Sequence, residues 1–589
     1  MSPLRYYIDV REPSAHLLRV SVEVPVHVWP QAREEGAVEF FLPVWTPGSY
    51  MVREYSRHVE GVTAADAATG NALVVVKTAK NRWRVRVAAG VAALRLEYRV
   101  YAHDLTVRTA DLNEEHAFWN GACAYLWPAA TSQGALRDLR ARIEVLHPTA
   151  WQLACALPTE SLGPGRAVLH ARDLDQAMDA PVLIGTLQVH EFTAAGHEHA
   201  LVLEGLGSVP VPPTLVPDAQ RIIERSVELF AGELPLDRYL FLALFADSGR
   251  GGLEHSECSV LLAPRTTFAP RKAYEDFLGL LAHEYFHLWN VKRMRPQELW
   301  TFDYERENHT ELLWVAEGFT SYYDDHLCLR AGVLSRDRYL EVLGDGIAEL
   351  RQTPGRLVHP LANASYDAWI KYYRPDENSR NSSQSYYSSG ALAALCLDLR
   401  IRERTDGARS LDDALVKLYR ATYGRGRGFT HEDVVRALGE TAGEDLEVFV
   451  DSLVRRPFEP DLDAAFALVG MRLQAKTENL PFLGVTFRGE DLTLASVVAG
   501  GPAAQAGLAP GDEILAVNDL RVTKANWKTV LENLAPERGL LRFLLHRRGR
   551  VLSHELRPEA STITSVQILA QPEANDRQVR LRRQWLCES

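Results

Sequence analysis

The feature that most constrains this chain is the pentapeptide His283-Glu284-Tyr285-Phe286-His287. Apolar residues recur at helical spacing from Arg271 to Asn290, with no proline inside the stretch, and this pattern predicts an α-helix. Two histidines four positions apart share one face of such a helix. Their ring nitrogens can hold one Zn²⁺, and Glu284 can take a proton from water at the metal. The pentapeptide therefore predicts two zinc ligands and a general base on one helix.

A catalytic zinc usually has three protein ligands. The metzincin pattern is excluded, because Asn290 and Arg293 stand where that pattern needs glycine and histidine. Acidic candidates follow the helix: Glu298, Glu305, Glu307, Glu311 and Glu317. Glu317 is the best of them, because it lies in an apolar segment where an unpartnered carboxylate is costly and a dication would remove the cost. The alternative is a structural Glu317 that pairs with an arginine or a backbone N–H.

Composition indicates a large globular protein of several domains. The chain has 589 residues, of which 46% are hydrophobic and 24% are charged, as in ordinary soluble proteins. Its net charge of −12 argues against nucleic acid as a partner. We find no apolar run of membrane-spanning length, no signal peptide, and no paired spacing among the six cysteines. These features predict a cytoplasmic protein with no membrane partner.

The hydrophobic pattern predicts a multidomain α+β fold. Apolar and polar residues alternate over most of residues 1–210, which predicts an N-terminal antiparallel β-sandwich that ends at the proline-rich segment Val209–Pro213. Residues 211–470 change from mixed to helical patterns, as expected for an α/β catalytic domain with an α-helical extension. Residues 471–560 form a further module, and residues 561–589 form a C-terminal tail with a possible strand at Ser565–Leu569.

The metal region resembles a known peptidase family. His283–His287 followed by Trp314–Gly318 is similar to the gluzincin metallopeptidases related to aminopeptidase N. The continuation Leu288–Arg293, the longer gap before the glutamate and the appended module resemble the glycyl aminopeptidase branch, as does Trp45–Tyr50 with Arg53 after it. The resemblance implies a thermolysin-like catalytic domain, one Zn²⁺ per chain on His283, His287 and Glu317, and a preference for small N-terminal residues such as Gly or Ala.

The same resemblance implies further site residues. Relatives carry G-x-M-E-N, whose glutamate binds the substrate's α-amine, and Gly251-Gly252-Leu253-Glu254-His255 stands at the corresponding place. Gly251, Gly252 and Glu254 are therefore expected to bind substrate, although Leu253 and His255 depart from the pattern. The alternative is a β-hairpin turn with a solvated Glu254.

An oxyanion donor is also implied by the family, in a Y-x-x-G motif that Tyr387-Ser388-Ser389-Gly390 fits. Ser389 replaces the lysine that usually precedes the glycine. Tyr387 is therefore the expected donor, since a phenol stays protonated at neutral pH. Tyr386 is the neighbouring alternative.

The C-terminal module resembles a PDZ domain. Phe482-Leu483-Gly484-Val485 is similar to the carboxylate-binding loop of such domains, and Gly501–Asn518 is similar to their central helix and strand. PDZ domains bind C-terminal peptides as an added strand. The module is expected either to bind a C-terminal peptide or to be purely structural.

Together these features predict a zinc aminopeptidase that acts on peptides with a free N-terminus and uses Glu284 as general base. One alternative is a zinc endopeptidase of the gluzincin class, which would not need an ammonium anchor at Glu254. A second alternative is a PDZ-bearing peptide-binding protein with weak or no catalysis. The intact set of His283, Glu284, His287 and Glu317 argues against the second alternative.

Overall fold

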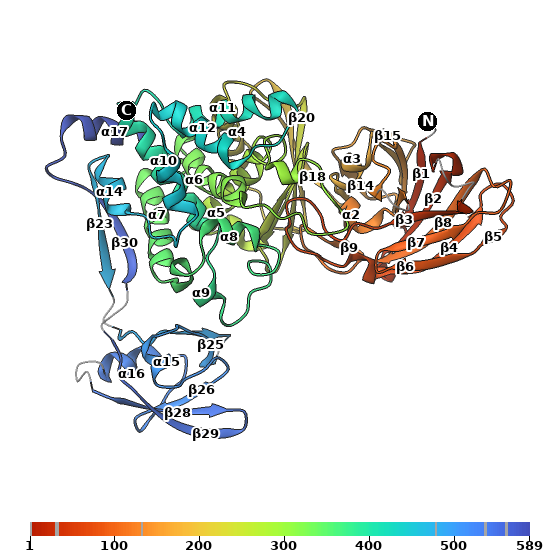
Figure 1. Ribbon diagram of the computed structural model, residues 1–589. Helices are drawn as coiled ribbons and strands as arrows, with labels where there is room; N and C mark the ends of the chain where they lie inside the picture. Colours follow the sequence, from red (N-terminus) through yellow and green to blue (C-terminus); the bar gives the residue numbers. More distant parts are fainter. Residues whose placement is uncertain are drawn as a thin grey trace. The chain divides into compact units, whose positions relative to one another are not determined.

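The computed structural model describes residues 3–29, 35–130, 134–477, 480–489, 491–534, 539–559 and 563–588. The chain forms two compact units. Unit 1 comprises residues 1–308 with the short segments 331–333 and 422–428. Unit 2 comprises residues 309–330, 334–421 and 429–589. Figure 1 follows the elements of both units from red at the N-terminus to blue at the C-terminus.

Unit 1 begins with the expected β domain. Its largest sheet has eight strands in the order β15-β16-β13-β1-β2-β8-β4-β5. Their bounds are β1 (Leu4–Asp9), β2 (Leu17–Pro25), β4 (Val59–Asp66), β5 (Ala72–Leu73), β8 (Ala93–Tyr101), β13 (Ala141–Leu146), β15 (Thr159–Ser161) and β16 (Arg166–Ala171). Pairing is antiparallel except between β1 and β13, which are parallel. Parallel partners need a long connection, and residues 10–140 supply it.

Two smaller sheets complete this domain. One has the order β12-β11-β3-β7-β6 and the other the order β14-β17-β10-β9. Their strands are β3 (Ala37–Phe41), β6 (Val75–Ala79), β7 (Arg82–Arg86), β9 (Ala110–Leu112), β10 (His116–Trp119), β11 (Trp127–Ala130), β12 (Gly134–Ala135), β14 (Gln152–Cys155) and β17 (Val182–Gly185), with short helices α2 (Gly121–Ala124) and α3 (Leu174–Met178). Alternate residues of β2 join Phe40 and Trp127 in one core. The expected N-terminal β domain is confirmed.

The catalytic sheet of unit 1 has five strands in the order β18-β19-β20-β22-β21. They are β18 (Gln188–Ala194), β19 (His197–Glu204), β20 (Arg238–Ala246), β21 (Gly251–Glu254) and β22 (Cys258–Pro264). β19 and β20 are parallel and are joined through helix α4 (Leu215–Leu229). The segment Val209–Pro213 therefore lies inside this crossover. The sheet extends back to Gln188, upstream of the boundary expected at residue 210.

The apolar residues from Leu253 to Leu262 are typical of a single strand, but the structure has two strands in this region, β21 and β22. The chain turns at His255, whose N–H donates to the Cys258 carbonyl over 2.8 Å. β21 then pairs antiparallel with β22 and forms an edge of the sheet. Helix α5 (Arg271–Phe286) packs on β21 and β22. This hairpin places the edge strand beside the helix that carries the histidines.

Unit 2 is mainly helical, as expected for residues up to 470. Its elements are the π-helical segment η6 (Trp314–Phe319) and the α-helices α6 (Thr320–Arg330), α7 (Arg336–Arg351), α8 (Leu361–Tyr366), α9 (Ser379–Ser382), α10 (Ser388–Arg404), α11 (Leu411–Ala421), α12 (His431–Ala442), α13 (Glu447–Val454) and α14 (Leu462–Ala467). The segment expected to be a tail is structured: β30 (Ile563–Ala570) pairs with β23 (Met471–Thr477), and α17 (Asp576–Trp585) buries Trp585.

The PDZ-like module also lies in unit 2. Its strands β24 (Val485–Arg488), β25 (Thr493–Val497), β26 (Glu513–Val517), β27 (Leu520–Arg521), β28 (Leu541–Arg547) and β29 (Arg550–Leu556) form one sheet, with α15 (Pro502–Gln505) and α16 (Trp527–Leu534). The module has its own hydrophobic core. Pro502 opens α15 and Gly507 follows it at φ +81°, the asymmetry typical of helix ends. Among the residues that the structure describes, no helix is long and apolar enough to cross a bilayer.

Candidate active site

Helix α5 presents both predicted histidines on one face. The ring centroids of His283 and His287 lie 4.7 Å apart, with the rings nearly perpendicular. The Nδ1–H of His287 donates to the carbonyl of Asn290 over 2.8 Å. Because a carbonyl only accepts, this contact fixes the tautomer and leaves Nε2 with a lone pair. The imidazole of His287 is therefore prepared to bind a metal through Nε2.

The turn after α5 holds this carbonyl in place. Val291 has φ of +107°, a left-handed value that is strained for a β-branched residue. The backbone around it is closed by hydrogen bonds from the N–H of Val291 to the Met294 carbonyl (3.0 Å) and from the N–H of Lys292 to the His287 carbonyl (3.0 Å). Sequence analysis did not identify the role of Asn290, because the group that contacts His287 is a backbone carbonyl, which any residue carries.

The edge strand β21 places the carboxylate of Glu254 near Glu284 of α5 and near His287. Glu254, Glu284 and His287 each offer one ligand atom, and these atoms lie within 4.8 Å of one another. The three side chains are only 4%, 4% and 1% exposed. Among the described residues, no group hydrogen-bonds to Oε1 of Glu254. A buried carboxylate without a partner is costly, and such groups gather at functional sites.

Gly252 permits this arrangement. A Cβ atom added to it would lie 1.9 Å from Oε1 of Glu284, so no other residue fits there without moving the carboxylate. Gly252 and Glu254 are two positions apart on a strand and therefore face the same side. Gly251 contacts neither carboxylate; the nearest atom to its added Cβ is Nη1 of Arg108, at 3.7 Å. The expected roles of Gly252 and Glu254 thus have a structural basis on one face of β21.

A further carboxylate, Asp179, whose side chain is 11% exposed, fixes the chain on both sides of this site. Its oxygens accept from the N–H and hydroxyl of Ser256 (2.9 and 2.7 Å) and from Nζ of Lys292 (2.8 Å), and Nδ1 of His255 lies at 3.1 Å. Burial alone would raise the pKa of Asp179, but the charges of Lys292 and His255 lower it far below its ordinary value. The role of Asp179 could not be predicted from the sequence. Its partners lie far away along the chain, and no local motif links them to a single aspartate.

In unit 2, the predicted ligand Glu317 lies in η6 and is 1% exposed. This segment crosses α10 at a glycine pair: an added Cβ on Gly318 would lie 2.5 Å from the Cα of Gly390 and 3.0 Å from the carbonyl of Tyr386. The close contact sets Glu317 beside the start of α10, where the predicted oxyanion donors stand. π-Helical turns are frequent at functional sites.

Both tyrosine candidates lie at this crossing. Burial and the charge of Glu317 raise the pKa of Tyr387 well above its ordinary value, so its phenol stays protonated as a hydrogen-bond donor. Its hydroxyl oxygen lies 3.2 Å from that of Tyr373. Tyr386 is fully buried, with its ring 4.7 Å from the ring of Tyr387. The choice of Tyr387 as the donor stays a prediction.

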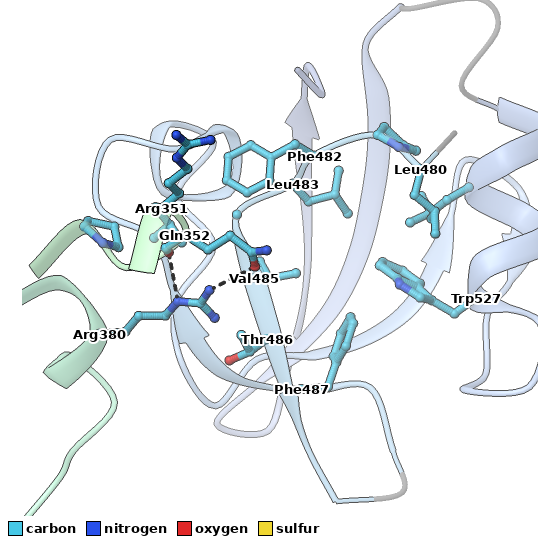
Figure 2. A pocket seen from close by; sticks show the side chains of 15 residues that line it. Arg351, Gln352, Arg380, Leu480, Phe482, Leu483, Val485, Thr486, Phe487 and Trp527 are labelled. Carbon is cyan, nitrogen blue, oxygen red and sulfur yellow. Dashed lines mark hydrogen bonds between the residues drawn. The ribbon is translucent and has the colours of Figure 1, made fainter. Parts of the chain in front are cut away.

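The predicted PDZ loop borders a groove of about 450 Å³ in unit 2 (Figure 2). β24 is an edge strand of its sheet, and among the described residues the N–H groups of Leu483 and Gly484 donate to no other group. Apolar side chains form one wall: Leu480, Phe487, Trp527 and Leu531. Arg351 and Arg380, from α7 and α9, line the groove as well. Sequence analysis did not foresee this contribution of the helical region.

Comparison with known proteins gives three family matches. Residues 5–186 match the N-terminal domain of M61 peptidases, residues 276–393 match the M61 glycyl aminopeptidases, and residues 493–543 match the PDZ domain. Aminopeptidase N of Caulobacter vibrioides is 27% identical over 179 residues, which are 30% of this chain and 19% of that protein. The match thus spans about a fifth of that relative.

Solved structures give likenesses over more of the chain. An aminopeptidase N family protein from Idiomarina loihiensis has a TM-score of 0.90 at 29% identity, over 99% of this chain and 100% of that one. An M1 zinc metallopeptidase from Deinococcus radiodurans has a TM-score of 0.49 at 15% identity, over 78% of this chain and 94% of that one. The second likeness is too distant to carry a functional conclusion.

Proposed function

From the premise that this chain resembles the M61 glycyl aminopeptidases in both its N-terminal and its catalytic region, we propose that it is a zinc-dependent aminopeptidase that releases N-terminal residues from peptides. One observation carries the proposal. Glu254, a buried carboxylate with no hydrogen-bond partner at Oε1 among the described residues, lies beside Glu284 and His287. A site of this charge favours a cation, and a free α-ammonium is the cation that a peptide offers.

The residues present fit a zinc ion. His283, His287 and Glu317 each offer a metal-ligand atom, and two histidines with one carboxylate are a known ligand set of catalytic zinc. The hydrogen bond from Nδ1 of His287 to Asn290 is the outer contact expected of such a ligand. We assign one zinc per chain to these residues. When bound, the ion supplies the Lewis acidity that activates water and polarises the scissile carbonyl.

The chain's own residues then move the protons. Glu284 takes a proton from the attacking water and returns it to the leaving amine. The phenol of Tyr387 donates to the oxyanion that develops on the carbonyl oxygen. Gly252 holds the Glu284 carboxylate at the edge of β21, where a substrate backbone can pair with the strand. Tyr386 supports Tyr387 as its buried neighbour in unit 2.

Glu254 favours the aminopeptidase over the endopeptidase alternative, because an internal peptide segment has no ammonium to neutralise it. We extend the proposal to small N-terminal residues, Gly or Ala. The description of the matching family as glycyl aminopeptidases supports the preference for Gly.

The test measures hydrolysis of aminoacyl anilides and of their N-acetylated counterparts, with and without a chelator. We expect chelator-sensitive hydrolysis of free amines only, fastest with Gly and Ala. Glu284→Gln should retain zinc, measured by metal analysis, and lose roughly 10²- to 10⁴-fold in kcat. Hydrolysis of the acetylated substrates would favour the endopeptidase, and full activity of the variant would refute the role of Glu284.

We also propose that the PDZ-like groove binds peptide C-termini. The open N–H groups of Leu483 and Gly484 suit a carboxylate, and the loop Phe482–Val485 precedes an edge strand that can accept a peptide as a further strand. Arg380 contributes positive charge; its guanidinium donates to the carbonyl and side-chain oxygens of Gln352 (Figure 2).

A titration with peptides and their C-terminally amidated forms tests this second function. We expect binding that is lost on amidation. Arg380→Gln should weaken it roughly 2- to 5-fold, the effect of a partly exposed charge. Arg472→Gln, at an exposed position of β23, is the matched control and should change nothing. Equal affinity for both peptide forms would refute recognition of the carboxylate, and binding of neither form would favour a structural role for the module.

A further inference from the structure

The segment Trp45–Tyr50 forms a tight turn in the N-terminal domain. The N–H of Ser49 donates to the Thr46 carbonyl over 3.1 Å, which closes the turn. Gly48 has φ of +87°, a conformation that favours glycine. The turn is buried: Trp45, Thr46 and Ser49 are fully covered. A buried turn in a β domain needs a reason, because turns ordinarily lie at the surface.

At Gly48 this turn contacts the carboxylate of Glu254. A Cβ added to Gly48 would lie 2.4 Å from Oε2, 2.5 Å from Oε1 and 2.7 Å from Cδ of Glu254. Atoms this close cannot coexist, so the carboxylate rests directly against the glycine backbone. Among the described residues, the hydroxyl of Thr46 and Oε1 of Glu254 have no hydrogen-bond partner. Two buried polar groups thus remain unsatisfied at this contact between the N-terminal domain and β21.

The turn is fixed in place from behind. The indole N–H of Trp45 donates to the Asp303 carbonyl over 2.7 Å, and the N–H of Val44 donates to the Tyr304 carbonyl over 2.8 Å. The Arg53 side chain donates to the hydroxyl of Ser49 over 2.6 and 3.0 Å. These contacts hold the turn against the segment that follows the zinc helix. A rigid turn can therefore set the position of the carboxylate that it touches.

We propose that the turn Thr46–Ser49 forms the closed end of the subsite for the substrate's α-amine, with Gly48 as the residue that positions Glu254. This inference rests on the proposed aminopeptidase function and deepens it. The N-terminal domain then takes part in substrate selection: it holds the anchor for a free ammonium and leaves no space for an acyl group beyond it.

Gly48→Ala tests the positioning role. The added methyl must displace the Glu254 carboxylate, which weakens recognition of the amine without touching the zinc ligands. We expect KM for aminoacyl anilides to rise roughly 10- to 100-fold, as for the loss of a hydrogen bond to a charged group, while kcat changes less than about threefold. Zinc content should be unchanged.

Gly90→Ala is the matched control. Gly90 has φ of +91°, close to that of Gly48, but nothing lies within 4 Å of its added Cβ. Both variants therefore carry the same backbone cost, and only one of them meets a carboxylate. Gly90→Ala should retain the wild-type KM. If Gly48→Ala behaves like Gly90→Ala in KM, the positioning role is overturned.

A double variant guards against a general loss of structure. Glu254→Asp withdraws the carboxylate by one methylene and leaves space for the methyl. Adding Gly48→Ala to Glu254→Asp should therefore change KM less than about threefold. A change as large as in the wild-type background, or failure of both Gly48 variants to fold, would show a merely structural contact and overturn the inference. A wild-type protein that hydrolyses no free-amine substrate would instead refute the proposed function.

Discussion

Asp179 and Glu254 are both carboxylates of unit 1 with little solvent exposure, and they differ in their partners. Asp179 is bound by Lys292, His255 and Ser256. Glu254 directly precedes His255 in the chain, yet Oε1 of its own carboxylate has no partner among the described residues. The surrounding structure thus supplies several partners to the carboxylate of Asp179 and none to Oε1 of Glu254.

The difference separates a structural charge from a functional one. The partners of Asp179 lower its pKa, and this carboxylate holds two chain segments together. The carboxylate of Glu254 lacks a partner at Oε1, so it can still bind a cationic group of the substrate. Asp179 binds the two residues that follow Glu254. The contacts of Asp179 therefore also hold Glu254 in place. Three predictions test this comparison.

The largest effect is expected at Asp179. Asp179→Ala leaves Lys292 buried without its partner, so the free energy of unfolding should fall by about 3–5 kcal/mol. Urea unfolding measures the change. The control is Asp247→Ala, which removes a surface ion pair with Arg265 and should cost less than about 1 kcal/mol. Equal losses in the free energy of unfolding of the two variants would contradict the structural role of Asp179.

The buried side chain of His116 is also compensated by carboxylates, and this compensation depends on pH. His116 lies 3.0 Å from Asp111 and 3.2 Å from Glu204; burial would lower its pKa, but these carboxylates raise it to about 9. The folded protein therefore binds this proton more tightly than the unfolded chain, whose histidine titrates near 6.5.

The stabilisation from this proton, about 3 kcal/mol, is fully present below about pH 6.5 and is lost as pH rises through about 9. Urea unfolding at several pH values should show the decline, and His116→Gln should abolish it. His27→Gln, at an exposed position, should retain the decline. An unchanged pH dependence in His116→Gln would contradict the assignment.

The smallest change in stability is expected at Glu254. Glu254→Gln removes an uncompensated buried charge, so stability should stay equal or rise by about 1 kcal/mol, the opposite of the loss at Asp179. KM for free-amine substrates should rise roughly 10- to 100-fold. Unfolding and steady-state kinetics measure both, with Glu191→Gln on the exposed strand β18 as control. A destabilised Glu254→Gln variant with unchanged KM would instead assign a structural role to Glu254.

Much of the catalytic helix was predictable from the sequence, because its information is local. A spacing of four residues places His283 and His287 on one face of a helix. The apolar residues around Glu317 indicate that this glutamate is buried. The multidomain α+β fold and the PDZ-like module also carry local signals. The hairpin at His255 was not predicted, since Leu253 to Leu262 reads as one apolar strand. The possible strand at Ser565–Leu569 corresponds to β30, but its pairing with β23 and the helix α17 were not predicted, because their partners precede them by a long stretch of chain.

The sequence by itself determined the chemistry that the chain can offer: two histidines and a glutamate on one helix, a buried acid downstream, and a glycine-rich strand before them. Only the tertiary structure decided which groups are satisfied and which stay open. Folding places Gly48 against Glu254, Asp179 between His255 and Lys292, and the Asn290 carbonyl on His287. These contacts join residues with no common sequence pattern, because a carboxylate's partners are set by packing in three dimensions rather than by spacing along the chain.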